Sequence, residues 1–132
     1  MRSIKAKNQK LAVVFGVADF PEGLEFLTEA AHCLQVGTWR YPAGTELAAH
    51  NHQWVSRTVE RTQEFIWVVQ GRLAATVYDE EDQPVAEVEL GPGQGMILLA
   101  GGHGYRILED DTRVVEVKCG PYPGAEIDRR RL

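Results

Sequence analysis

Residues 44–52 read GTELAAHNH and residues 64–71 read EFIWVVQG. His50 and His52 are two positions apart, so on a strand their side chains point to the same face. Glu64 opens the second segment, whose β-branched and aromatic residues are typical of a buried strand. Two imidazoles beside a carboxylate form a ligand set for a divalent metal ion. These segments therefore predict neighbouring strands with a metal site between them.

Around this stretch the chain alternates short β-type runs with turn residues. Strands are expected at 11–15, 34–41, 46–52, 62–69, 73–78, 85–90, 96–99, 105–108 and 114–119. Only residues 24–33 have apolar side chains at roughly helical spacing, which favours a short helix there. Many short strands with little helix predict an all-β sandwich or barrel of one domain.

Composition narrows the class of protein. The chain has 132 residues, 44% of them hydrophobic, and a formal net charge of -5. That charge argues against a nucleic-acid partner. No apolar run approaches the roughly 20 residues of a membrane helix, and the first residues lack the apolar core of a signal peptide. The expectation is a cytoplasmic protein with no membrane partner, in which Cys33 and Cys119 are reduced thiols.

The strand expected around residues 64–69 is apolar on both faces. Phe65, Trp67 and Val69 lie on one face, and Ile66 and Val68 lie with the glutamate on the other. One face fills the interior, so the other needs a cover from flanking strands or from a partner chain. We therefore predict a homodimer.

The spacing Gly44-x5-His50-x-His52 and then Glu64-x6-Gly71 resembles the first motif of the cupin superfamily, and residues 90–105 resemble the second. The resemblance implies a cupin-type double-stranded β-helix, or jelly-roll barrel, with a core at about 34–119, an N-terminal extension 1–33 and a C-terminal tail 120–132. It also implies four metal ligands, which are His50, His52, Glu64 and His103. The eleven-residue insert between His52 and Glu64 is longer than usual.

His103 lies one residue earlier than in the common cupin register, and the glycines around it could permit a bulge that restores its aim. Residues 57–64, 101–105 and 116–122 are similar to a group of small bacterial and archaeal cupins for which the resemblance implies no established reaction. The ligand set would suit Zn²⁺, Fe²⁺, Ni²⁺ or Mn²⁺.

The function expected from this resemblance is a metalloenzyme of the dioxygenase or sugar-type isomerase class, with a small-molecule ligand in the barrel. The alternative is a binding module without turnover. Glu60 has the strand parity of Glu64 and is either a second carboxylate near the metal, where Glu60 or Glu64 would transfer protons in the reaction, or a charge on an exposed loop. Glu116 and Lys118 share a face, either as a buried ion pair that lines the cavity and is a candidate for acid-base catalysis or for anchoring an anionic ligand, or as an outward, solvated pair. Tyr105 is expected to serve packing rather than binding.

Overall fold

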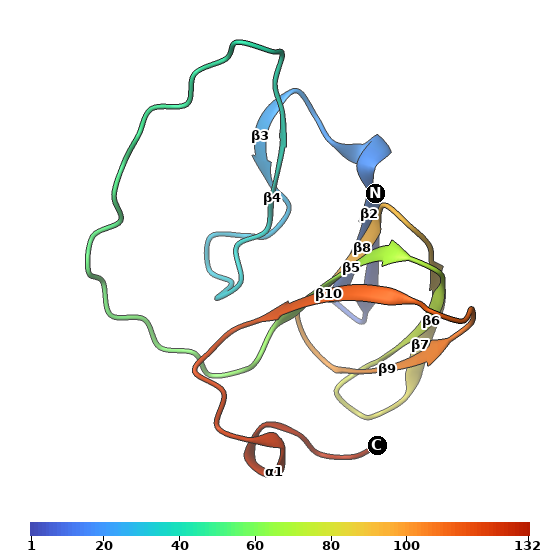
Figure 1. The fold of residues 1–132 in the computed structure, drawn as a ribbon. Coiled ribbons are helices and arrows are strands. Elements are labelled where there is room, and N and C mark those ends of the chain that lie inside the picture. The colour runs from blue at the N-terminus through green and yellow to red at the C-terminus, as the bar shows by residue number, and fades with distance from the viewer.

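The computed structural model describes residues 1–132 and contains ten strands in three antiparallel sheets (Figure 1). The largest sheet has the order β1 (Arg2–Ala6), β2 (Gln9–Gly16), β8 (Gln94–Leu98), β5 (Glu64–Gln70) and β10 (Arg113–Lys118). The second has the order β7 (Pro84–Leu90), β6 (Leu73–Tyr78) and β9 (Gly102–Ile107). The third is the hairpin of β3 (Gly23–Phe26) and β4 (Gly37–Arg40). The only helices are the 3-10 turn η1 (Val17–Asp19) and α1 (Ala125–Asp128), so the all-β class predicted from the sequence is confirmed.

The main core lies where the five-stranded and three-stranded sheets face one another. It contains fully buried side chains from both sheets, including Ile66 and Val68 of β5 and Val77 of β6. Alternate residues of β5 point into this core, as the period of a strand requires. Burying a side chain of this size stabilises the fold by about 1.5–3 kcal/mol.

The opposite face of β5 is partly covered by the chain itself, although Val69 on that face remains 55% exposed. Phe65 and Trp67 pack with a second cluster that includes Phe15 of β2 and, from the N-terminal third, Phe20 and Val36. The Phe15 and Phe65 rings stack with centroids 5.9 Å apart. Strands β1 and β2 extend the same sheet, so residues before position 34 contribute directly to the body of the fold.

The strand expected at 46–52 does not form. Residues 41–61, which we call the arm, have no strand or helix, and every one of them is exposed. Figure 1 shows the arm leaving β4 and returning to β5 as a wide loop that stands away from the sheets. The hydrogen bonds made by residues 42–60 join positions at most three apart, such as His50 Nδ1 to the Ala48 carbonyl at 3.1 Å. Without a neighbouring ladder, an extended segment has nothing to hold it as a strand.

The helix expected at 24–33 is also absent. Residues 23–26 form β3, in which Leu24 lies opposite Trp39 and Phe26 opposite Gly37. A helix of about ten residues is marginal in water without an apolar face packed on a core. The hairpin pairing with β4 supplies cross-strand contacts instead.

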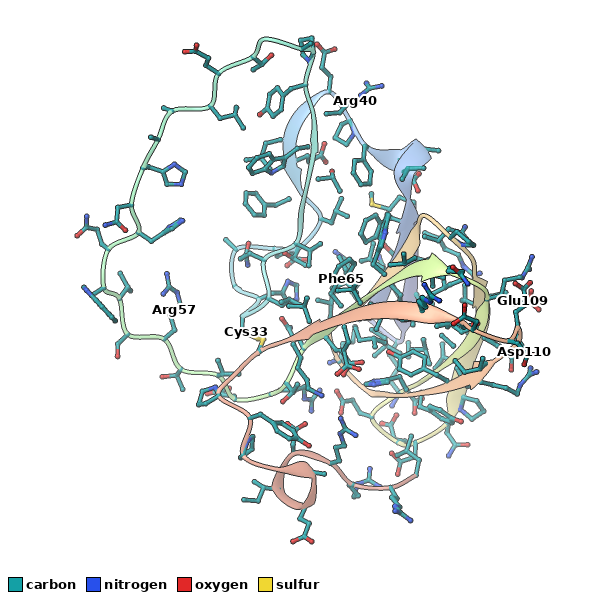
Figure 2. The ribbon with its side chains drawn as sticks, in the orientation of Figure 1. Cys33, Arg40, Arg57, Phe65, Glu109 and Asp110 are labelled. Atoms are coloured by element: carbon teal, nitrogen blue, oxygen red, sulfur yellow. A yellow bond between two sulfur atoms is a disulfide. The ribbon has the colours of Figure 1, made fainter.

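The expectation of two reduced thiols was wrong, because Cys33 and Cys119 form a disulfide. Their Cα atoms lie 6.6 Å apart although 86 positions separate them in sequence. Gln63 brings the two segments together: its carbonyl accepts from the Cys119 amide at 3.1 Å and its side-chain oxygen accepts from the Leu34 amide at 3.2 Å. In Figure 2 the sulfur of Cys33 lies beside the end of β10.

None of the helices has the length and apolar character that crossing a membrane requires.

Candidate functional site

A cavity of about 580 Å³ opens at one end of the two facing sheets, and we call it the Glu64 cleft. Its walls come from β5, β9 and β10, the turn at 79–82 and the C-terminal tail. Only four of its seventeen lining residues are hydrophobic. A volume in this range suits a small molecule, since ligand pockets typically measure about 300–1,000 Å³. The polar walls indicate a ligand that makes many hydrogen bonds.

Glu64, the first residue of β5, forms the centre of the cleft and is only 6% exposed. The hydroxyl of Tyr105 donates a hydrogen bond to Glu64 Oε1 at 3.1 Å, and His103 Nε2 lies 3.5 Å from the same oxygen. His103 and Tyr105 are two positions apart on β9, so the strand presents both side chains to the same side. The three residues form one polar cluster built from two sheets.

The electrostatics of the cluster favour an ionised carboxylate and a neutral phenol. Burial of the Glu64 carboxyl disfavours its charge, but His103, Tyr105 and Lys118 outweigh burial and hold its pKa below the ordinary value. Burial and the adjacent Glu64 carboxylate both raise the pKa of Tyr105. Glu64 is therefore a hydrogen-bond acceptor and Tyr105 a donor at neutral pH.

Ion pairs hold the walls of the cleft. Arg61 pairs with Glu80 across one side. Arg130 in the tail makes a two-pronged contact with Asp82, at 2.7 and 2.8 Å. The hydroxyl of Thr62 donates a hydrogen bond to the carboxylate of Asp128 in α1, which holds the tail against the residues just before β5. These contacts place the tail along the cleft as a wall.

The structure brings together two of the four residues expected to bind metal. Glu64 and His103 meet in the cleft, and β9 pairs with β6 without a bulge, Val77 lying opposite His103. His50 and His52 lie side by side, their ring centroids 5.1 Å apart, but they lie on the exposed arm and do not line the cleft.

The structure also places the two expected catalytic carboxylates, Glu116 and Glu60, in different surroundings. Glu116 of β10 lines the cleft and pairs with Lys118 at 2.9 Å, but its side chain is 44% exposed and Lys118 does not line the cleft, so this is not the buried pair of the cavity-lining alternative. Glu60 is exposed on the arm and does not line the cleft, which corresponds to the exposed-loop alternative.

The four expected ligands do not fit a metal ion in this arrangement. No group of three or more His, Cys, Asp or Glu side chains is gathered closely enough to hold one. The reason lies in the arm: a metal site needs ligands within about 2.0–2.3 Å of one ion, and residues 50 and 52 are not held by any strand pairing.

Tyr105 and the tail are the parts of the site that sequence reasoning missed. The sequence did contain a signal for Tyr105. It lies two positions after His103, so on a strand the two side chains point to the same face, and a histidine expected at the metal site implies that the tyrosine points the same way. Asp128, Arg129 and Arg130 line the cleft from the segment expected only as a C-terminal tail. Nothing in the local sequence indicates that this segment folds back.

Comparison with known proteins adds no assignment to this site: no protein-family model, no curated protein and no solved structure matches the chain.

Proposed function

We propose that the protein binds a small hydroxyl-rich molecule of the sugar class in the Glu64 cleft. The observation that carries this proposal is the buried Glu64 carboxylate, held by Tyr105 and His103 at the centre of a polar cavity of about 580 Å³. An ionised carboxylate, a neutral phenol and an imidazole place hydrogen-bond acceptors and donors next to one another. Sugar hydroxyls both donate and accept, so they match that arrangement.

Binding without turnover is favoured over proton transfer by Glu64. A general base works best when its pKa lies near the operating pH. The neighbours of Glu64 move its pKa down, away from neutrality, so the carboxylate is a weak base. The same neighbours make it a well-positioned acceptor. This corresponds to the binding-module alternative drawn from the sequence.

The order of the strands supports a jelly-roll architecture for this binding protein. From β5 to β10 the chain crosses repeatedly between the two facing sheets, with β5, β8 and β10 in one and β6, β7 and β9 in the other. Such crossing is typical of double-sheet jelly rolls, which include the cupins. The sheets do not close into one barrel, because β9 and β10 are edge strands.

We expect Glu64→Gln to weaken sugar binding by about 10- to 100-fold, since hydrogen bonds to a charged group contribute about 1.5–3 kcal/mol. Tyr105→Phe should weaken it less, because the phenyl ring still fills its place. A saccharide panel tested by thermal shift would identify a ligand for calorimetry. Tyr41→Phe, which removes the same hydroxyl from the exposed arm, is the matched control and should bind as wild type does.

The pH dependence of binding gives a second measurement. The pKa of Glu64 is lowered, so its charge persists above its ordinary value of 4.5 and is lost only as pH falls through the lower pKa of the folded protein. The contribution of the Glu64 carboxylate to binding should be fully present at and above that ordinary value and be lost as pH falls through the lower pKa of the folded protein. The Glu64→Gln protein should lack this dependence. Binding that is equal in both proteins at neutral pH would contradict a role for the carboxylate.

A second candidate is a divalent-metal cupin that acts as a metalloenzyme in the cytoplasm. The observation that favours it is the pair Glu64 and His103 in the cleft, together with the adjacent imidazoles of His50 and His52 on the arm. β9, which carries His103, is an edge strand, and an edge strand offers free backbone groups to an extended segment. This candidate needs an arrangement of the arm other than the one described above.

Metal analysis separates the two candidates. Protein purified without chelator or a nickel column would be measured by plasma mass spectrometry, alongside the double variant His50→Ala/His52→Ala. If the metal candidate is right, wild type carries near-stoichiometric Zn, Fe, Ni or Mn and the double variant loses it. Equal, trace metal in both proteins would reject the metal candidate and leave the sugar-binding proposal standing.

A further inference from the structure

The chain exposes more surface than a compact protein of its mass. Its accessible area is 9281 Å². A folded monomer of 14.7 kDa is expected to expose about 6,900 Å², from the scaling of area with mass. The excess is about 2,300 Å² per chain, and it needs a physical explanation because exposed area of this size includes apolar side chains.

The arm and the hairpin account for much of the exposed apolar surface. On the arm, Trp54 is fully exposed and Leu47 and Val55 are at least half exposed. On the hairpin, Leu24, Phe26 and Trp39 share one face, which we call the hairpin face. Their exposed fractions are 46%, 53% and 59%. An isolated two-stranded sheet with a bare apolar face is only marginally stable in water.

We propose that a second copy of this chain covers both surfaces, the arm of each copy lying on the hairpin face of the other. Such an exchange is reciprocal, so one two-fold contact buries both apolar surfaces of both copies. The sequence predicted a homodimer from the outer face of β5. The proposal places the contact on the arm and the hairpin instead, because Phe65 and Trp67 are already partly buried within the chain.

The area agrees with a stable dimer. If each copy buries its excess of about 2,300 Å², the pair buries about 4,600 Å², within the range of about 2,000–5,000 Å² seen for obligate homodimers. The arm alone supplies the 21 consecutive exposed residues from 41 to 61, and an interface uses about 20–30 residues per partner.

The charges on the arm do not oppose self-association. Glu46 and Glu60 are balanced by Arg57 and Arg61, so the arm carries no net charge, and its apolar side chains lie between these groups along the sequence. Figure 2 shows the arm running from Arg40 past Arg57 on the side of the molecule opposite the Glu109–Asp110 turn. A partner can therefore approach the arm away from that acidic turn. The Glu64 carboxylate lies on neither surface, and Arg61 is the one arm residue that lines the cleft, so the proposed dimer does not depend on what the cleft binds.

The mass of the full chain in solution tests the proposal first. By light scattering and sedimentation at micromolar concentration, wild type should have twice the chain mass of 14.7 kDa. Trp54→Ser on the arm and Trp39→Ser on the hairpin face should each weaken the dimer by about 30-fold, as loss of a buried aromatic anchor does. Ile127→Ser removes an apolar side chain that is 78% exposed on α1, and it should leave the dimer unchanged.

Hydrogen exchange tests the role of the arm without any substitution. The arm amides make only local bonds within one copy, so they should exchange rapidly in dilute protein and be protected in the dimer. A monomeric wild type at about 100 µM, well above typical interface affinities, would overturn the proposal. So would a dimer whose arm amides exchange freely, or a dimer that both tryptophan variants form as well as the Ile127→Ser control. A monomer with protected arm amides would also overturn it, by showing that the arm docks on its own chain.

Discussion

Replacing Cys33 and Cys119 together by serine should lower the free energy of unfolding by about 2–4 kcal/mol. The disulfide closes a loop spanning 86 positions, and the loss of conformational freedom that such a closure imposes on the unfolded chain grows with loop length. In the folded state it fixes the segment after β3 to the end of β10, beside the Gln63 hydrogen bonds. Urea unfolding of the oxidised wild type and the double variant measures the difference.

Reduction of the wild type provides the matched control for this prediction. Wild type in excess dithiol should unfold at the midpoint of the double serine variant, and the variant should not respond to dithiol. A wild type that is equally stable with and without dithiol, with no free thiols before reduction, would show that the disulfide contributes nothing to stability. Because Cys119 directly precedes the tail, sugar binding in the cleft should also weaken on reduction.

Gly101→Ala should lower the free energy of unfolding by about 3 kcal/mol or more and distort the cleft. Gly101 has a φ of +70°, in the left-handed region that costs other residues about 1–2 kcal/mol. A Cβ at this position would also lie against the Tyr78 carbonyl oxygen, a backbone atom of the paired strand β6 that cannot move aside. The residue lines the cleft next to β9, so the strain falls on the strand that carries His103 and Tyr105.

Gly104→Ala is the control, because it places the same methyl group three positions further on, within β9, without either cost. A Cβ there would meet no atom within 4 Å, and the residue does not have a positive φ. Its stability should be within about 0.5 kcal/mol of wild type, as for most surface substitutions. Thermal and urea unfolding of both variants checks the pair. If Gly101→Ala is as stable as Gly104→Ala, the close approach of Gly101 to Tyr78 is not a constraint on this fold.

The sequence predicted the existence of the strands from β5 to β10, because their signals are local, although β9 begins at Gly102 and not at residue 105. Alternating or continuous apolar runs end at turn residues such as Gly71, Pro92 and Gly101, and both the strand period and the turns depend on nearest neighbours. The same parity places Glu64 with Ile66 and Val68 on the face that turns inward. Local pattern was thus sufficient to direct Glu64 into the interior.

The arm shows where that reasoning stops. His50 and His52 have the alternation of a strand, yet a strand forms only if another backbone completes its ladder. Which segment lies alongside depends on the whole topology and, by our proposal, on a second chain. The same applies to the expected helix at 24–33, where pairing with β4 replaced a weak local preference.

The sequence by itself determined that this chain is all-β and that Glu64 belongs to its interior, because strand parity and turn chemistry act within a few residues. Only the tertiary structure decided which groups meet. The Cys33–Cys119 bond spans 86 positions, Tyr105 reaches Glu64 from another sheet, and the tail returns to the cleft. Contacts between distant segments depend on how the sheets pack, and no local pattern contains that information.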